Sequence, residues 1–308
     1  MRTAFVKGLT KLMQDDDKVI TITADMGFSV FEEMQSQFPS RFINTGVTEQ
    51  ASVSTAAGMA LSGHKVFFYA QAPFATMRCF EQIRLDVAYG NLDVKIIGSA
   101  TGFFANQLGV SHFATEDVGL MRLLPGMTVF TPGDAYEADW ATRKAYELST
   151  PCYIRLTKAG SPVVHNKPID IELGKFIPLR SGKDASLFVS GSLLPMAIDI
   201  RDTLAKHNVS LGVYSLPTVK PLAKEEILLQ AKLTGNVFTL EDHNIVGGLG
   251  SSFAEIFAED RTGVNFYRFG IPDKFTNITG SVPFLLAHNG LSSEIISQEI
   301  LRFLAINY

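Results

Sequence analysis

The stretch Asn44-Thr45-Gly46-Val47-Thr48-Glu49-Gln50, which runs directly into residues 51–63, decides how we interpret this sequence. Its first half holds turn-forming residues. The part that follows is rich in alanine, serine and glycine and ends at Gly63, as a helix does. Glu49 therefore lies in the first turn of a predicted helix, where an acid could simply complement the helix dipole, an effect of about 0.3–1 kcal/mol. The small side chains along the helix indicate more than that, namely that another backbone or a flat ligand comes close to it.

Composition and charge define a broad class. The chain has 308 residues, of which 46% are hydrophobic and 19% charged, with a net charge of -4, so we expect a globular protein of two domains and no nucleic-acid partner. The first residues lack the apolar core of a signal peptide, and no apolar run approaches the length of a membrane span. Cys79 and Cys152 fit neither a metal spacing nor a disulfide framework. We therefore expect a cytoplasmic protein without a membrane partner.

Short apolar runs alternate with helical patterns, which predicts an α/β fold built from mainly parallel sheets. We expect strands at 19–23, 65–70, 94–97, 128–130, 153–156, 185–190, 210–214, 236–240 and 264–268. We expect helices at 3–13, 49–61, 74–89, 116–123, 134–148, 194–207, 224–229, 250–258 and 292–305. Residues 161–184 are rich in glycine, proline and charge and predict a linker between domains at 1–160 and 185–308.

Several motifs, taken in order along the chain, resemble one enzyme family. The run Gly46–Gln50 and the alanine-rich helix after it are similar to the opening of the pyrimidine-binding domain in thiamine-diphosphate enzymes of the transketolase and deoxyxylulose-phosphate synthase group. Further similar stretches are Phe74–Arg84, Asp93–Gly98, Ser111-His112, Glu116-Asp117, Met121–Met127, Leu240–His243, Gly247–Gly250 and Phe269–Asp273. The resemblance covers nearly the whole chain. It implies two three-layer αβα domains, the pyrimidine-binding domain followed by the transketolase C-terminal domain.

The resemblance also implies the roles of individual residues. Glu49 would give a proton to a ring nitrogen of the cofactor's aminopyrimidine, for which burial that disfavours the ionised carboxylate would suit it. Phe74 would stack on that ring, and Arg78 would belong to the same cofactor site. Asp25 would lie near the thiazolium half, although an acid there could also cap the helix expected after Phe28. His112 would approach the reacting carbons of the substrate.

The substrate side of the resemblance is incomplete. Arg2, Ser29 and Lys158 stand where the phosphosugar enzymes hold a terminal phosphate, with Lys158 replacing an arginine and its two-pronged hydrogen bonding. Ala100 and Leu108 stand where the family has a histidine and an aspartate, so two polar groups that would read a sugar are apolar here. The resemblance therefore implies a two-carbon ketol transfer on an atypical substrate, with a deoxygenated, a branched and a nucleotide-linked sugar as the alternatives.

A second departure concerns the diphosphate of the cofactor. The family holds Mg²⁺ and the diphosphate with a GDG motif, and this sequence has none. The resemblance therefore implies one half of a split transketolase. A partner chain would supply GDG and the metal, and the two chains would form an α2β2 assembly. Two alternatives stay open, the β-subunit of a 2-oxoacid dehydrogenase and a non-catalytic scaffold that keeps only the fold.

Two clusters in the second half invite other interpretations. Gly247, Gly248 and Gly250 follow a predicted strand, but the spacing of a dinucleotide-binding loop fails at Phe253, so we expect tight packing of a strand against a helix. The consecutive residues Glu241-Asp242-His243 are poorly arranged to converge on a metal ion, and we expect them at a subunit interface instead.

Overall fold

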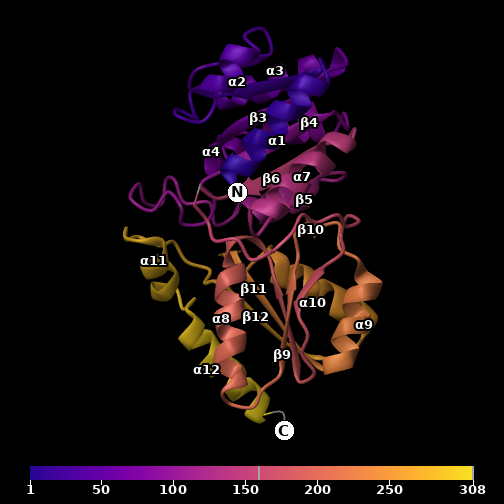
Figure 1. The fold of residues 1–308 in the computed structure, drawn as a ribbon, viewed down its shortest axis with the longest axis vertical. Helices are drawn as coiled ribbons and strands as arrows, with labels where there is room; N and C mark the ends of the chain where they lie inside the picture. The colour runs from indigo at the N-terminus through magenta and orange to yellow at the C-terminus, as the bar shows by residue number, and fades with distance from the viewer. Residues whose placement is uncertain (159, 307–308) are drawn as a thin grey trace.

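The computed structural model of this chain describes residues 1–158 and 160–306, and it consists of two β-sheets that each lie between helices. The amino-terminal half forms the upper body in Figure 1 and the carboxy-terminal half the lower one. This arrangement confirms the predicted α/β fold of two αβα domains. In the part of the chain that the structure describes, every helix is too short or too polar to cross a membrane.

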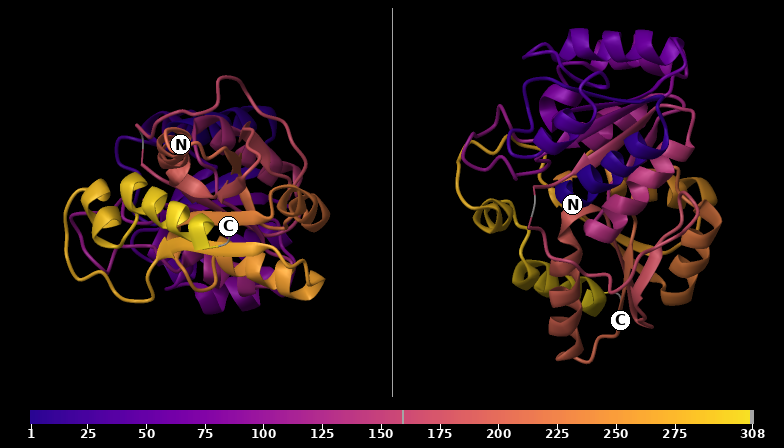
Figure 2. Two further views of the ribbon diagram at one scale, coloured as in Figure 1. Left: turned by 90° about the horizontal axis from the view of Figure 1, so that it is seen from below. Right: turned by 45° about the horizontal axis from the view of Figure 1, so that its top comes forward.

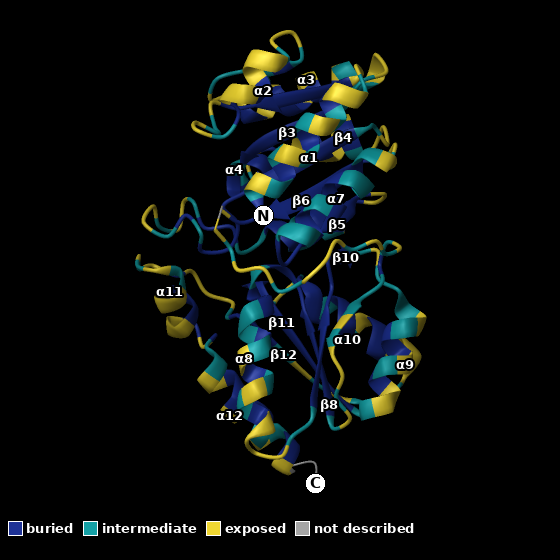
Figure 3. Cartoon of the chain, in the orientation of Figure 1, coloured by how far each residue is buried: buried dark blue, intermediate teal, exposed yellow. Residues whose placement is uncertain are grey.

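The first sheet has seven strands in the order β10-β5-β6-β4-β3-β1-β2, and all neighbours are parallel except β10 with β5. Its strands are β1 (Val19–Thr23), β2 (Phe42–Asn44), β3 (Lys65–Gln71), β4 (Val94–Ser99), β5 (Thr128–Phe130), β6 (Cys152–Leu156) and β10 (Thr218–Lys220). The central strands are buried along their length, as Figure 3 shows in dark blue, because helices cover both faces.

Apolar helix faces cover the two sides of this sheet. One face carries α1 (Arg2–Asp15) and α7 (Ala135–Glu147), whose Phe5 and Trp140 pack on strand residues such as Phe67. The other face carries α3 (Glu49–Leu61), a π-helical turn (Ile83–Ala88) and α6 (Asp117–Leu123). Buried small residues let α3 lie close to the sheet.

The second sheet has five strands in the order β12-β11-β8-β9-β7, and only β7 is antiparallel to its neighbour. Its strands are β7 (Ile177–Arg180), β8 (Ala185–Val189), β9 (Leu211–Ser215), β11 (Asn236–Asn244) and β12 (Asn265–Ile271). The helices around it are α8 (Leu194–Ala205), α9 (Lys224–Thr234), α10 (Leu249–Asp260), α11 (Val282–His288) and α12 (Ser293–Ile306). Figure 2 shows α8 and α12 together on one side of the sheet, where their apolar faces pack.

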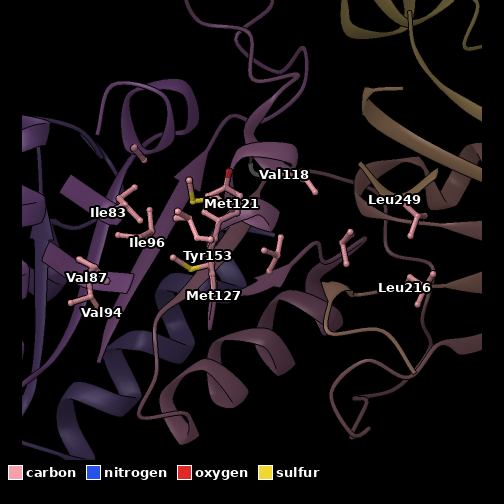
Figure 4. Packing of buried hydrophobic residues seen from close by; sticks show 14 of the residues in the cluster. Ile83, Val87, Val94, Ile96, Val118, Met121, Met127, Tyr153, Leu216 and Leu249 are labelled. Atoms are coloured by element: carbon pink, nitrogen blue, oxygen red, sulfur yellow. The ribbon is translucent and has the colours of Figure 1, made fainter. Parts of the chain in front are cut away.

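The two halves share a continuous interior. One buried cluster runs from Ile83 and Met121 in the first half to Leu216 and Leu249 in the second, and Figure 4 shows these side chains in one layer. The strand β10 also returns from the second half to extend the first sheet. The segment 161–184, which we expected to be a linker, contains β7 and so contributes a strand to the second sheet.

One predicted helix, at 74–89, is broken in the structure. It consists of α4 (Ala72–Thr76), the short helix α5 (Phe80–Gln82) and the π-helical turn. At the break, the Arg78 N–H donates to the carbonyl oxygen of Pro73 at 3.2 Å, and the Cys79 thiol donates to the carbonyl of Phe74 at 3.0 Å. A side chain has therefore taken the acceptor that a regular helix needs for the Arg78 amide.

The helix α2 (Glu32–Gln37) begins shortly after Phe28, where a helix was expected, whereas the short elements β2, β7, β10 and α11 have no counterpart among the predicted ones. Each is shorter than eight residues, too short for the spacing of apolar residues to repeat.

Candidate active site

The predicted site residues of the first half follow the carboxyl ends of adjacent strands. Asp25 follows β1, Glu49 follows β2, Phe74 follows β3, the loop with His112 follows β4, and Lys158 follows β6. These strands are neighbours in the order β6-β4-β3-β1-β2, so their carboxyl ends form one edge of the sheet. Ligands of parallel α/β sheets bind at this edge.

Glu49 begins α3 and is buried, with 4% of its surface exposed. The turn before it is held by the Asn44 side chain, whose Oδ1 accepts hydrogen bonds from the backbone N–H of Gly46 and of Asp25, each at 3.0 Å. Asp25 and Gly46 both have positive φ angles, so this turn is compact and Asp25 is tied to the same corner as Glu49.

Arg78, Phe74 and His112 continue from Glu49 in a chain of contacts. Arg78 Nη1 donates to Glu49 Oε2 at 2.7 Å, and the Arg78 guanidinium lies over the Phe74 ring, 4.1 Å from its centroid. The Phe74 ring meets the His112 ring edge-on, with the centroids 5.0 Å apart. The structure therefore brings these four predicted residues together.

The corner suits the flat aminopyrimidine that the resemblance implies. Among the described residues, Glu49 Oε2 has Arg78 as its hydrogen-bond donor, while Oε1 has no protein partner. The planar Arg78 guanidinium bonds this acid and covers one face of the Phe74 ring, so the two side chains present a carboxylate acceptor and an aromatic face, the groups that a flat ring with hydrogen-bond donors would need. In the part of the chain that the structure describes, His, Cys, Asp and Glu side chains form no group of three able to hold a metal ion.

His112 lies on the loop 100–116, which we call the His112 loop. Its Nδ1 is 2.9 Å from Ser111 Oγ, and its ring is half-buried. Ala100 is buried at the base of the loop with a positive φ, whereas Leu108 is 58% exposed near its tip. Of the two positions where the family has polar groups, Ala100 is thus buried and Leu108 exposes an apolar side chain to solvent.

The three residues expected to hold a terminal phosphate are not all brought together. Arg2 and Ser29 line one cavity of about 560 Å³ between α1 and residues 29–33. Lys7 and Lys11 line it as well, together with the acids Asp15 and Glu33, so its wall carries three cations and two carboxylates. Lys158 is exposed and does not line this cavity.

Sequence reasoning misplaced the polar residues at the end of β11. Glu241, Asp242 and His243 are buried between the two halves of the chain itself, which corrects the expectation of a subunit interface. Glu241 accepts hydrogen bonds from the backbone N–H of Leu249 at 2.7 Å and of Gly250 at 2.9 Å, so it caps the start of α10. A side chain on Gly248 would overlap Glu241, which confirms the expected tight packing of strand and helix.

Arg155 was not among the predicted site residues. Its partners Asp117 and Asp242 belong to two motifs that the sequence analysis did single out, Glu116-Asp117 and Leu240–His243. Arg155 lies on β6, where Nε donates to Asp117 Oδ2 at 2.9 Å and Nη1 pairs with Asp242 of the second domain. Burial opposes the charge of Arg155, but Asp117 and Asp242 outweigh it and raise the pKa of the guanidinium above its ordinary value. A buried, hydrogen-bonded ion network thus joins the domains beside the His112 loop.

Comparison with known proteins agrees with this fold. The family model described as "Transketolase, pyrimidine binding domain" matches residues 1–162, and that of "Transketolase, C-terminal domain" matches residues 174–296. The fold and site thus define a two-domain chain of the thiamine-diphosphate enzyme class. The chain belongs to the transketolase family.

Relatives from this family match almost the whole chain. A putative transketolase C-terminal section from Methanocaldococcus jannaschii is 33% identical over 98% of this chain and 95% of its own length. A 6-deoxy-6-sulfo-D-fructose transketolase subunit from a Clostridium species is 34% identical over 96% of this chain and 92% of its own length. A solved split-gene transketolase, described as an inactive β4 tetramer, superposes with a TM-score of 0.90 at 34% identity, over 99% of this chain and 98% of its own.

Proposed function

We propose that this chain is the C-terminal subunit of a two-chain, thiamine-diphosphate-dependent transketolase, which moves a two-carbon ketol unit from a ketose to an aldose. The observation that carries the proposal is the environment of Glu49: a buried carboxyl at the start of α3, held through one oxygen by Arg78 and set beside the Phe74 ring. The other oxygen has no partner among the described residues and is free to meet a ligand.

The residues of this chain would divide the work as follows. Bound thiamine diphosphate would supply the nucleophilic carbon of the reaction. Glu49 Oε1 would share a proton with a ring nitrogen of the aminopyrimidine, and Phe74 would offer its aromatic face to that ring. Arg78, by holding Glu49 Oε2, would aim Oε1 at the ring. His112 would hydrogen-bond to the substrate or move protons at its oxygens.

The substrate would carry a terminal anion but differ from ordinary pentose and hexose phosphates. The cavity with Arg2 and Ser29 supports an anionic end, and Lys158 would add a charge near the same strand ends. The apolar residues Ala100 and Leu108 leave sugar hydroxyls there without hydrogen-bonding partners. A relative named for a sulfonated deoxysugar, 6-deoxy-6-sulfo-D-fructose, supports such a departure within the family.

A second polypeptide would complete the enzyme. It would carry the GDG motif, which this sequence lacks, and would hold the diphosphate and Mg²⁺ through oxygen ligands. Two copies of each chain would form an α2β2 assembly, and neither chain would turn over substrate alone. The solved split-gene relative, an inactive assembly of β chains only, supports this need for a partner.

Reconstitution tests the proposal. Proteins that co-purify with this chain from its native host are searched for a polypeptide with GDG, and the two chains are mixed with thiamine diphosphate and Mg²⁺. We expect ketol transfer in a panel of donors and acceptors only when both chains and the cofactor are present. Decarboxylation of 2-oxoacids without ketol transfer would refute the proposal in favour of a dehydrogenase β-subunit. Brisk turnover of xylulose 5-phosphate with ribose 5-phosphate would refute the atypical substrate.

A further inference from the structure

We propose that the carboxy-terminal domain of this chain positions His112, because it fixes the His112 loop at its closing end and through Phe103, Asn106 and Phe113. The inference rests on the proposed function, in which His112 meets the substrate. It assigns a role in the active site to a domain that contributes none of the predicted site residues.

His112 cannot hold its own position through side-chain bonds. Among the described residues the one hydrogen-bonding partner of its imidazole is Ser111, the preceding residue on the same loop, at 2.9 Å. Its ring contact with Phe74 is an edge-on contact at 5.0 Å, which constrains direction weakly. The location of the imidazole is therefore set by the backbone of the loop that carries it.

The closing end of the loop is held by a buried network that crosses the domain boundary. Gly102 and Ala114 pair through two backbone hydrogen bonds of 2.9 and 3.0 Å. Arg155 Nη2 donates both to the Ala114 carbonyl at 3.1 Å and to the Asp242 carbonyl at 3.0 Å. The Asp242 carboxylate pairs with the same guanidinium and also accepts from Ser192 Oγ at 2.8 Å. Asp242 thus helps to orient Arg155, which in turn bonds the closing end of the loop at Ala114.

The residues after Asp242 add a backbone clamp. The Asn244 N–H donates to the Thr115 carbonyl at 2.6 Å, directly beyond the closing pair. His243 Nε2 accepts from the Gly119 N–H at 3.1 Å, and its Nδ1 bonds the Asn244 carbonyl at 2.7 Å. Nε2 thus accepts from one element while Nδ1 donates to the next residue, so both ring nitrogens are held. The end of β11 is therefore hydrogen-bonded to the chain at Thr115 and Gly119, shortly after His112.

Residues on both sides of the exposed tip of the loop pack into the second domain. Phe103 and Phe113 are buried, lie edge-on with centroids 5.0 Å apart, and belong to the apolar cluster formed mainly by α8, α11, α12 and the second sheet. Asn106 adds a hydrogen bond from Nδ2 to the Gly280 carbonyl at 2.8 Å. Since Phe113 directly follows His112, any shift of the second domain carries the histidine with it.

A double-mutant cycle in the assembled two-chain enzyme tests whether Asp242 acts through His112. Asp242→Asn keeps the shape but removes one of the two carboxylate charges that orient Arg155, the one from the second domain. We expect kcat/KM to fall roughly tenfold to a hundredfold, the cost of misplacing a catalytic group by about 1 Å. In a His112→Ala background the same change should cost less than about threefold, since effects acting through one group are not additive. Losses that multiply in the double variant would overturn the proposal.

Hydrogen exchange in the free chain tests the anchoring without any activity. Asp242→Asn should speed amide exchange in residues 103–115 and leave α1 and α3 unchanged. Asn106→Ala serves if Asp242→Asn does not fold, and it should have a smaller effect in the same segment. Glu255→Gln is the matched control, because its 2.7 Å ion pair with Arg122 also crosses the domains but does not touch the loop.

The two measurements separate the inference from the proposed function. Faster exchange in residues 103–115 supports the anchoring even if no partner yields ketol transfer. A failure of ketol transfer by itself would contradict only the proposed function. Unchanged exchange in both loop variants, or equal acceleration in Glu255→Gln, would overturn the inference whatever the enzyme does.

Discussion

Glu49→Gln in the assembled enzyme should abolish nearly all activity while hardly changing stability. Glu49 and Arg78 are paired at 2.7 Å, but the arginine side chain is 41% exposed, so solvent screens the pair and its loss should cost at most about 1 kcal/mol. For a chain of 308 residues that corresponds to a fall in Tm of roughly 1–2 °C. Activity should fall by a factor of about 10²–10⁴, because glutamine cannot exchange a proton with the cofactor ring.

A matched control is available on α7. Asp139 pairs with Arg143 at 3.1 Å, and that arginine side chain is 39% exposed, close to the value for Arg78. Asp139→Asn should therefore shift Tm by no more than Glu49→Gln does, since Asp139 is itself 43% exposed, and should leave turnover intact. The assay measures Tm by calorimetry and initial rates of ketol transfer for both variants. Glu49→Gln with a rate within about threefold of the parent would refute the role of Glu49, and would favour the scaffold alternative.

Three further predictions follow from other parts of the chain. Gly248→Ala should destabilise the fold by about 1–3 kcal/mol in denaturant titration, because the new methyl group would overlap Glu241, whereas an unchanged midpoint would contradict that close approach. Burial by itself would lower the pKa of His165, but the hydrogen bond to Glu137 has the larger effect, and the pKa in the folded protein is raised. The pairing therefore stabilises the fold fully below about pH 6.5, the ordinary pKa of histidine, and this stabilisation is lost as pH rises through the folded pKa. The Tm should thus fall between pH 6 and 9 by more in the parent than in His165→Asn, and equal slopes would argue against this pair. Leu108→Asp should lower KM for hydroxylated aldose phosphates about tenfold, through one new hydrogen bond, if Leu108 lies beside the acceptor in the assembled enzyme.

Local patterns in the sequence determined much of the fold. The buried runs at Val19–Thr23 and Thr128–Phe130 are strands with the predicted limits, and the alanine-rich helix spans Glu49–Leu61 as expected. Each of these elements is specified by residues that are close in sequence, through periodicity, turn residues and helix ends. The same local order allowed the family resemblance to be recognised from short motifs.

Contacts between distant residues decided the rest. The helix expected at 74–89 breaks because the Cys79 thiol takes the Phe74 carbonyl. Strand β10 leaves the second half to join the first sheet, and its three residues are too few to show a pattern. Arg155 pairs with Asp242, which lies 87 positions away in the sequence. The two side chains are buried together only because the two domains pack against each other.

For the candidate site, the sequence by itself determined which chemical groups are present: an acid at the start of a small-residue helix, an aromatic ring, an arginine and a histidine in a loop. Only the tertiary structure decided that Arg78 bridges Glu49 and Phe74, and that the second domain holds the loop of His112. The physical reason is that residue type and spacing fix local backbone geometry, whereas the pairing of buried polar groups is settled by which surfaces exclude water from each other.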